Sequence, residues 1–170
     1  CRQRGLPFAA DPSQQLAWSD GPMVRDLIEG AAYLFTNDYE AALIHNKTGW
    51  EADEVAARVG VRITTHGKDG VVIEAPGQEP ITVGVVPAQH IADPTGVGDA
   101  FRAGFLSALA WGLPLERCAQ VGCLLATHVI ETVGTQEYVL RRGLALERFA
   151  DAYGQVAADE ISAHLGALRG

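Results

Sequence analysis

A glycine-rich segment in the second half of the sequence has the residue types of a phosphoryl-transfer site. Gly96 and Gly98 flank Val97. Asp99 follows directly, at the start of an apolar, helix-forming run. Glycine lets the backbone turn tightly and leaves no Cβ in the way of a ligand. The first N–H groups of a helix lack intrahelical acceptors and the helix dipole adds partial positive charge there, so this turn favours an anion such as phosphate.

Asp99 is the residue of this segment that could carry out catalysis. A carboxylate beside a bound phosphoryl group can accept the proton of an attacking hydroxyl. Phosphoryl transfer otherwise needs mainly in-line positioning and stabilisation of charge. From the residues alone an alternative stays open, in which Asp99 caps the helix and the glycines only reverse the chain.

Hydrophobic periodicity predicts the elements that must position this turn. β-Branched and other apolar runs predict strands at residues 6–10, 33–36, 61–65, 71–74 and 81–86, and an extended piece at 89–92. Helical spacing predicts a helix after Pro22, then helices at about 38–45, 51–59, 99–111, 115–133 and 144–168, the last with breaks. The spacing of Thr48 and Glu51 predicts a capping box for the helix at 51–59.

The alternation of strands and helices predicts an α/β fold. We expect a mostly parallel sheet covered by helices on both faces. The strands at 61–65 and 71–74 form a predicted hairpin that completes the edge of this sheet. The glycine-rich turn then follows the last strand and opens the helical part of the chain.

The composition is that of a globular protein and argues against two classes of partner. Of the 170 residues, 48% are hydrophobic and 20% are charged, which is a composition that can form a hydrophobic core. The chain is long enough for one ordinary core and too short for two domains of usual size. The net charge of −8 argues against a nucleic-acid partner, because phosphate backbones require clustered Lys and Arg. No apolar run approaches the roughly 20 residues of a membrane span, so we expect no membrane partner.

The cysteines predict the redox environment. Cys1, Cys118 and Cys123 have no metal-ligand spacing, and their odd number does not suggest a disulfide framework. We therefore expect reduced thiols, with Cys118 and Cys123 packed within a helix, and a cytoplasmic protein.

The wider motif around the glycines resembles the signature of a kinase family. Residues 93–105 read Asp-Pro-Thr-Gly-Val-Gly-Asp-Ala-Phe-Arg-Ala-Gly-Phe. This is similar to the D-T-x-G-A-G-D-x-F signature of ribokinase-type carbohydrate kinases. The resemblance implies that Asp99 is the catalytic base and that Gly96, Val97 and Gly98 form the anion hole. Proline in place of the signature's threonine removes one backbone donor, whereas valine in place of alanine keeps its N–H.

Two motifs in the first half of the chain match the same family. Asn37 and Glu40 have its N-x-x-E spacing, which implies a role in organising Mg²⁺ and phosphate through water. The alternative is a capping box at a helix start, and both interpretations can hold together. Thr65 and Gly67 match its T-L-G-x-x-G segment, which implies contact with the nucleotide. A hairpin turn is the alternative, and His66, in place of leucine, is expected to make a polar or surface contact.

The resemblance also implies a site for a monovalent cation such as K⁺. Its ligands would be the side chain of Asp93 and the backbone carbonyl oxygens of Thr95 and Gly134. Oxygen ligands around a weakly hydrated cation are chemically reasonable, although a sequence does not define the directions of carbonyl groups.

The motifs are most similar to those of actinobacterial adenosine kinases within this family, and they match the C-terminal half of a member. The resemblance implies the C-terminal part of a ribokinase-like three-layer sandwich. Residues 1–170 would be one partial domain that binds ATP, and the N-terminal substrate and lid half would be absent. The start at Cys1, in the middle of an α/β pattern, favours the same interpretation.

The expected function is phosphorylation of a hydroxymethyl group of adenosine, or of a related nucleoside or sugar, with ATP and Mg²⁺. A ribokinase- or fructokinase-like sugar kinase is the alternative within this class. An inactive nucleotide-binding fragment is the alternative outside it, and the isolated chain is expected to be inactive. A homodimer of the full-length protein stays open.

Overall fold

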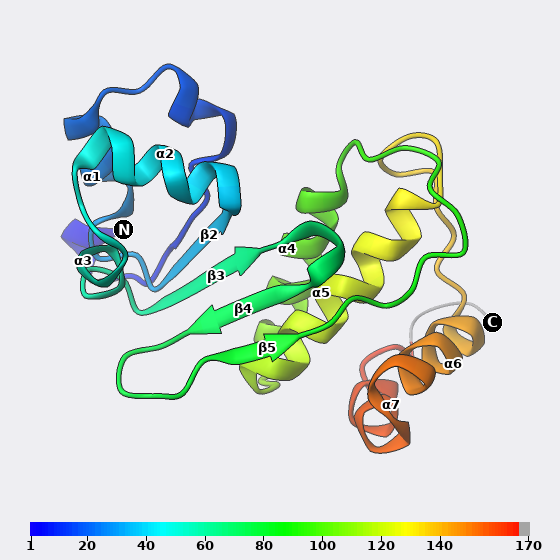
Figure 1. Cartoon of the computed structure of the whole chain (residues 1–170). Coiled ribbons are helices and arrows are strands. Elements are labelled where there is room, and N and C mark those ends of the chain that lie inside the picture. Colours follow the sequence, from blue (N-terminus) through cyan, green and yellow to red (C-terminus); the bar gives the residue numbers. More distant parts are fainter. Residues whose placement is uncertain (167–170) are drawn as a thin grey trace. The chain divides into compact units, whose positions relative to one another are not determined.

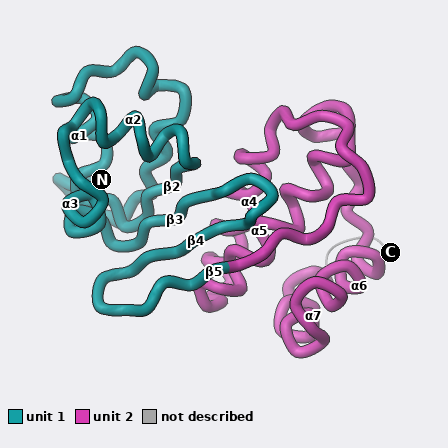
Figure 2. The backbone as a smooth tube through the Cα atoms, viewed as in Figure 1, with its two compact units in different colours: residues 1–82 teal, residues 83–170 magenta. Residues whose placement is uncertain are grey.

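The computed structural model describes residues 1–166 and divides into two compact units. The first unit comprises residues 1–82 and the second residues 83–170 (Figure 2). Figure 1 labels most of the helices and strands of the two units.

The first unit contains the sheet and three α-helices. Its strands are β1 (Ala9–Ala10), β2 (Tyr33–Asn37), β3 (Val61–Thr65), β4 (Val71–Glu74) and β5 (Ile81–Val83), the last of which ends just inside the second unit. Its helices are α1 (Gly21–Ile28), α2 (Asp38–Thr48) and α3 (Ala52–Ala56), with short 3₁₀ turns η1 (Arg2–Arg4), η2 (Ser13–Ala17) and η3 (Gly67–Asp69).

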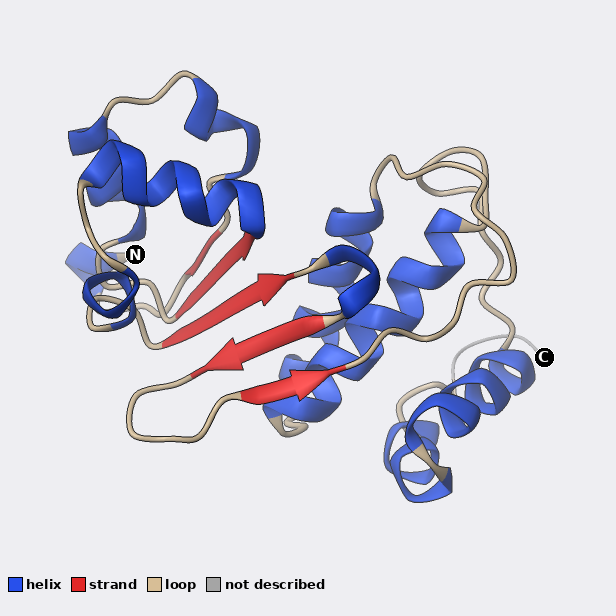
Figure 3. Cartoon of the chain, viewed as in Figure 1, coloured by secondary structure: helices blue, strands red, loops and turns tan. Residues whose placement is uncertain are grey.

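The five strands form one mixed sheet in the order β1-β2-β3-β4-β5 (Figure 3). β1, β2 and β3 are parallel, and β3 pairs antiparallel with β4, so the predicted hairpin is confirmed. β5 is shorter than predicted: it ends at Val83 rather than Val86. Val86 lies beyond the end of this strand, and its carbonyl oxygen accepts a hydrogen bond from the Thr127 hydroxyl at 2.8 Å instead of pairing with a neighbouring strand.

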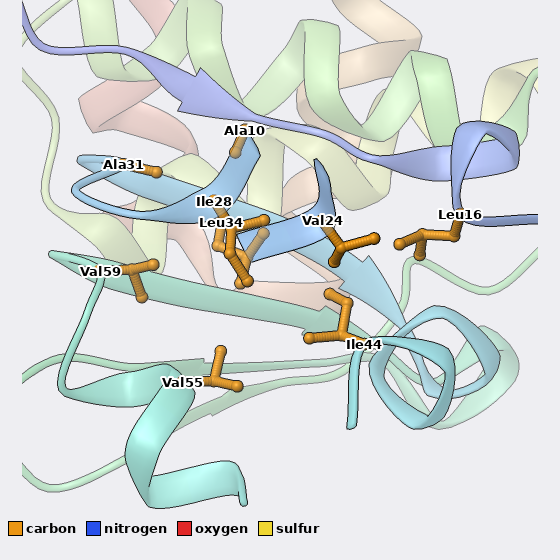
Figure 4. Packing of buried hydrophobic residues seen from close by; sticks show 9 residues of the cluster. All are labelled: Ala10, Leu16, Val24, Ile28, Ala31, Leu34, Ile44, Val55 and Val59. Atoms are coloured by element: carbon orange, nitrogen blue, oxygen red, sulfur yellow. The ribbon is translucent and has the colours of Figure 1, made fainter. Parts of the chain in front are cut away.

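A hydrophobic cluster holds the helices of the first unit against the sheet (Figure 4). Leu34 of β2, Ile28 of α1 and Ile44 of α2 are all buried in it, together with Val55 of α3. Three consecutive residues of β2 are buried, a pattern typical of a strand covered on both faces. This packing fixes the end of β2, from which α2 begins.

The capping box predicted for α3 is wrong by one turn. Thr48 is the last residue of α2, where its hydroxyl donates to the Ile44 carbonyl at 2.7 Å. The N-cap of α3 is Glu51, whose backbone N–H donates to the Glu54 carboxylate at 3.0 Å. The spacing of Thr48 and Glu51 resembled a capping box, but Thr48 already satisfies a carbonyl of the preceding helix.

The second unit is helical after a long connection. Its helices are α4 (Val97–Ala110), α5 (Leu115–Ile130), α6 (Arg142–Tyr153) and α7 (Gln155–Ser162). The helical region predicted for 144–168 is thus two helices, broken at Gly154, and residues 167 and 168 of that prediction lie outside the described residues. Gly154 has a φ of +89°, which ends α6.

Close packing of α4 on α5 forms the core of this unit. A Cβ on Gly104 of α4 would lie 2.8 Å from the Cα of Gly122 on α5, so the helices approach as closely as glycine permits. Cys118 and Cys123 are buried on α5 as predicted, and burial raises the pKa of each thiol to about 11. Over residues 1–166, none of the helices has the length and apolar character that crossing a membrane requires.

Candidate active site

The glycine-rich turn opens α4 with a left-handed residue. Gly96 is the N-cap, with a φ of +80°, and the helix begins at Val97. The first helical hydrogen bond runs from the Ala100 N–H to the Gly96 carbonyl at 2.9 Å. The Val97 N–H makes a long bond of 3.4 Å to the Pro94 carbonyl. Helix geometry leaves the next N–H groups without an intrahelical acceptor, and these are the donors that could bind an anion.

Gly96 is required by packing as well as by its backbone conformation. A Cβ at this position would lie 2.7 Å from Cγ2 and 3.0 Å from Cβ of Thr135. Thr135 belongs to the loop that follows α5, so the turn is packed against a segment about 40 residues away in the sequence.

Asp99 projects from the first turn of α4 into solvent. Its side chain is 87% exposed, and Oδ1 lies 3.8 Å from a guanidinium nitrogen of Arg102. In the part of the chain that the structure describes, no side chain caps α4, and the N-cap is Gly96. The alternative that Asp99 serves as the helix cap is therefore wrong, and its carboxylate is accessible to a ligand.

Asp93 joins the turn to the loop after α5. One carboxylate oxygen accepts the N–H of Thr95 at 2.9 Å, and the other accepts the N–H of Gly134 at 3.4 Å. These bonds, those from Thr95 first, hold the pKa of Asp93 below its ordinary value. The structure thus brings together Asp93, Thr95 and Gly134, the three residues expected around a monovalent cation.

The segment that leads into the turn is fixed by α5 and α6. Arg148 of α6 makes two bonds of 2.8 Å to the Glu131 carboxylate and one of 2.9 Å to the Pro87 carbonyl. Glu131 also accepts the N–H of Gln89 at 2.6 Å. The carbonyl of Ile130 accepts two further N–H groups, at residues 92 and 93. The predicted extended piece at 89–92 is therefore held by helix ends and side chains, and it has no assigned strand.

In the first unit, Asn37 and Glu40 form a complete capping box at the start of α2. The Asn37 side chain accepts the Glu40 N–H, and the Glu40 carboxylate accepts the Asn37 N–H, both at 2.8 Å. Glu40 is only 8% exposed. The capping role expected for this pair is confirmed. It holds the Glu40 carboxylate against the backbone N–H of Asn37, the last residue of β2.

Thr65 lies beside this capping box at the same edge of the sheet. It pairs with Asn37 across the parallel strands β2 and β3. Gly67 opens the loop that follows, with a φ of +57°. Between them, His66 makes the polar contact expected of it, at 2.7 Å from its Nδ1 to a carboxylate oxygen of Asp38. Carboxyl ends of parallel strands are where open α/β sheets bind ligands.

The candidate residues therefore form two groups, each assembled within one unit. The capping box and the loop after β3 belong to the first unit, and the glycine-rich turn with Asp93 and Gly134 belongs to the second. No group of three or more His, Cys, Asp or Glu side chains able to hold a metal is found among residues 1–166.

The sequence interpretation assigned no role to Arg102 and did not predict the contact of Thr135 with Gly96. Arg102 follows Asp99 by three residues, and helical spacing alone places it on the same face. Thr135 had no such signal, because its contact with Gly96 depends on the path of a distant loop.

Comparison with known proteins identifies the family. Residues 1–141 match the pfkB family carbohydrate kinases. A nucleoside kinase of Methanocaldococcus jannaschii is 37% identical over 126 residues, which cover 74% of this chain and 41% of that protein. A nucleoside kinase of Methanothermobacter thermautotrophicus is 29% identical over 154 residues, covering 90% and 49%. The chain therefore belongs to the pfkB family, and it spans about half the length of these relatives or less.

A solved structure gives the same result for the fold. The nucleoside kinase of Burkholderia thailandensis in complex with inosine superposes with a TM-score of 0.84 and 39% identity, covering 89% of this chain and 51% of that chain. The structure of the M. jannaschii nucleoside kinase, an archaeal member of the ribokinase family, has a TM-score of 0.79 and 34% identity, covering 85% and 48%. The predicted family and the ribokinase-like α/β fold are both confirmed.

Proposed function

We propose that this chain is the nucleotide-binding, C-terminal half of an ATP-dependent kinase that phosphorylates a hydroxymethyl group of a nucleoside or sugar. The observation that carries the proposal is the exposed carboxylate of Asp99 in the first turn of α4, beside the Gly96–Gly98 turn. Membership of a family of small-molecule kinases supports the same reaction class.

Asp99 would act as general base in this reaction. The γ-phosphoryl group of ATP would lie against the turn formed by Gly96, Val97 and Gly98, where the N–H groups of the helix start that lack an intrahelical acceptor would stabilise its charge. The acceptor hydroxyl would attack phosphorus while Asp99 takes its proton. A new P–O bond to the acceptor would form as the bond to ADP breaks, and ADP would carry away the bonding electrons.

The residues of the first unit would hold the nucleotide and Mg²⁺. Thr65, Gly67 and Asn37 would contact ATP at the carboxyl edge of the strands, and Glu40 would hold Mg²⁺ through water. A single carboxylate fits this role, because Mg²⁺ in kinases is commonly bound by one or two carboxylates, substrate phosphates and waters. Mg²⁺ would supply neutralisation of the phosphate charge.

The second unit would also hold a monovalent cation, K⁺ in particular. The Asp93 carboxylate already accepts hydrogen bonds from the N–H groups of Thr95 and Gly134. The backbones of both segments, which carry the proposed carbonyl ligands, therefore lie close to this carboxylate. The bound cation would lie beside the turn and hold the two segments together. We further infer a cytoplasmic enzyme.

Adenosine is the acceptor that we propose first. The motif of residues 93–105 supports it, as does the similarity to two nucleoside kinases. A sugar kinase similar to ribokinase is the second candidate, because an Arabidopsis thaliana ribokinase is 23% identical over 141 residues. We propose that a further half of the enzyme supplies most of the contacts to the acceptor.

The test is ADP release by the full-length enzyme, with Mg-ATP and adenosine, ribose or fructose, beside Asp99→Asn. We expect turnover with adenosine and its loss in Asp99→Asn, with ATP binding retained. Turnover with a sugar alone would keep the mechanism and overturn the choice of acceptor. No turnover with any acceptor, or full activity of Asp99→Asn, would overturn the catalytic assignment and favour a nucleotide-binding fragment.

A further inference from the structure

The first unit contains a cavity of about 270 Å³ that is lined by residues of β2, β3, α2 and α3. Its apolar lining includes Leu34 of β2, Ile44 of α2 and Val55 of α3, all of them buried members of the hydrophobic cluster of this unit (Figure 4). Every lining residue lies between positions 34 and 62, so the first unit forms this cavity by itself.

Trp50 adds an aromatic wall, which contacts with its neighbours hold in place. The guanidinium carbon of Arg58 lies 4.2 Å from the centre of a Trp50 ring, and that of Arg25 lies 5.4 Å from it. Arg25 is itself fixed, because its Nε donates to the Thr48 carbonyl at 3.1 Å. Nδ1 of His45 lies 3.0 Å from the Trp50 carbonyl oxygen. A wall that is ordered before binding reduces the entropy that a ligand must overcome.

Arg62 of β3 contributes a guanidinium to the lining of this cavity. Its side chain is 16% exposed, and one of its nitrogens lies 3.5 Å from a carboxylate oxygen of Glu74, its partner on β4. Within residues 1–166 this guanidinium makes an ion pair but no hydrogen bond. Glu74 therefore balances its charge, while its N–H groups are left to donate to a ligand. A planar guanidinium can donate two parallel hydrogen bonds to one carboxylate.

We propose that this cavity is a second ligand site, which binds a small aromatic carboxylate with its ring against the apolar lining and its carboxylate on Arg62. Ligand sites typically combine a mainly apolar lining with a few polar groups. An apolar cavity of about 150 Å³ can hold benzene, so the larger cavity here has room for a ring that carries a carboxylate.

The other charged side chain of the lining favours a singly charged ligand. Glu51 lines the cavity as well, and its side chain is 76% exposed. A carboxylate this exposed can turn toward water when a monoanion binds. It would repel the second charge of a phosphate group, which makes a nucleotide a poor occupant.

The experiment is a titration with benzoate, followed by ¹H–¹⁵N NMR on the 170-residue chain and by calorimetry on the full-length enzyme. We expect the amide signals of Ala41, Ala52 and Val55 to shift in a saturable manner, with a Kd of about 1 mM or tighter. Benzyl alcohol, which has the ring without the charge, should bind about tenfold more weakly. Saturating Mg-ADP should leave the Kd for benzoate unchanged, because the residues that line the cavity differ from those of the proposed nucleotide site.

Three variants test the contacts. Arg62→Met should weaken benzoate binding about tenfold or more and leave benzyl alcohol binding almost unchanged, because only the carboxylate loses its donors. Glu74→Gln should bind benzoate more tightly than the wild type, since it removes the carboxylate that competes for Arg62. Ala41→Leu should abolish binding of both probes without lowering the melting temperature, because the larger side chain fills existing space.

Arg117→Met is the matched control. Arg117 lies in the second unit, its side chain is 13% exposed, and its partner is Glu160 of α7 at 2.7 Å. It is therefore as buried as Arg62 and also paired with a glutamate. Its loss should lower thermal stability without changing the Kd for benzoate.

Three results would overturn the site, and each leaves the proposed kinase function standing. The first is the absence of saturable benzoate binding in both the chain and the full-length enzyme. The second is equal affinity for benzoate in the wild type and in a folded Arg62→Met variant. The third is displacement of benzoate by Mg-ADP, which would mean that the probe occupies the nucleotide site.

Discussion

Replacement of Gly96 by alanine tests the geometry of the turn directly. Two effects act against a side chain at this position. The φ of +80° is a left-handed conformation, and the new Cβ would lie 2.7 Å from Cγ2 and 3.0 Å from Cβ of Thr135. Rotation of the Thr135 side chain can relieve the first contact but not the second, because Cβ does not move when χ1 changes.

The two effects can be given separate magnitudes. A left-handed conformation costs a residue with a Cβ about 1–2 kcal/mol. Displacing Thr135 adds less than the about 1–3 kcal/mol of an overpacked core, because Thr135 is an exposed residue of a loop that can shift; we take about 1 kcal/mol. We therefore expect Gly96→Ala to lower the free energy of unfolding by about 2–3 kcal/mol.

The chain offers a matched control at Gly112. This residue also has a φ of +80°, but a Cβ there would meet nothing within 4 Å. Gly112→Ala should therefore cost only the conformational part, about 1–2 kcal/mol. The assay is urea denaturation followed by far-UV circular dichroism, with all variants measured under one set of conditions.

A double-mutant cycle isolates the contact with Thr135. In a Thr135→Gly background the clash is absent, so Gly96→Ala should cost the same as Gly112→Ala. Two results would refute the reasoning: equal costs for Gly96→Ala and Gly112→Ala in the wild-type background, or no recovery when Thr135 is replaced by glycine.

Three further predictions follow from the contacts described. Glu131→Gln should cost about 1–3 kcal/mol of unfolding free energy, because it leaves Arg148 of a largely buried pair without its carboxylate. The bonds from Arg148 lower the pKa of Glu131, so this difference from the wild type should be present above the ordinary carboxylate pKa of about 4.3 and shrink as the pH falls below it, as measured by denaturation across pH. Asn37→Ala should cost about 1 kcal/mol by removing the acceptor of the Glu40 N–H, and Asn37→Asp should restore most of it in the same assay. Of the three thiols, only the exposed N-terminal one should react with a thiol reagent at pH 8 in the native chain, because burial raises the pKa of both α5 cysteines to about 11; rapid reaction of all three would contradict their burial.

Local sequence patterns were sufficient to predict most of the helices and strands. The strands β3 and β4 have the predicted limits, because β-branched runs bounded by turn residues define a strand within a few residues. The start of α2 was predicted from Asn37 and Glu40, since a capping box is a contact between residues three apart. Where two local patterns competed, as at Thr48 and Glu51, the sequence led to the wrong cap.

The sequence by itself determined the motif of residues 93–105, and with it the family and the candidate base Asp99. These depend on residue types at short, fixed spacings, which can be recognised in a sequence without knowledge of the fold. Only the tertiary structure decided that Asp99 is exposed rather than a cap, and that Asp93 binds the N–H of Gly134, 41 residues away. Such contacts depend on how a distant loop returns to the turn, and no periodicity in the sequence encodes that path.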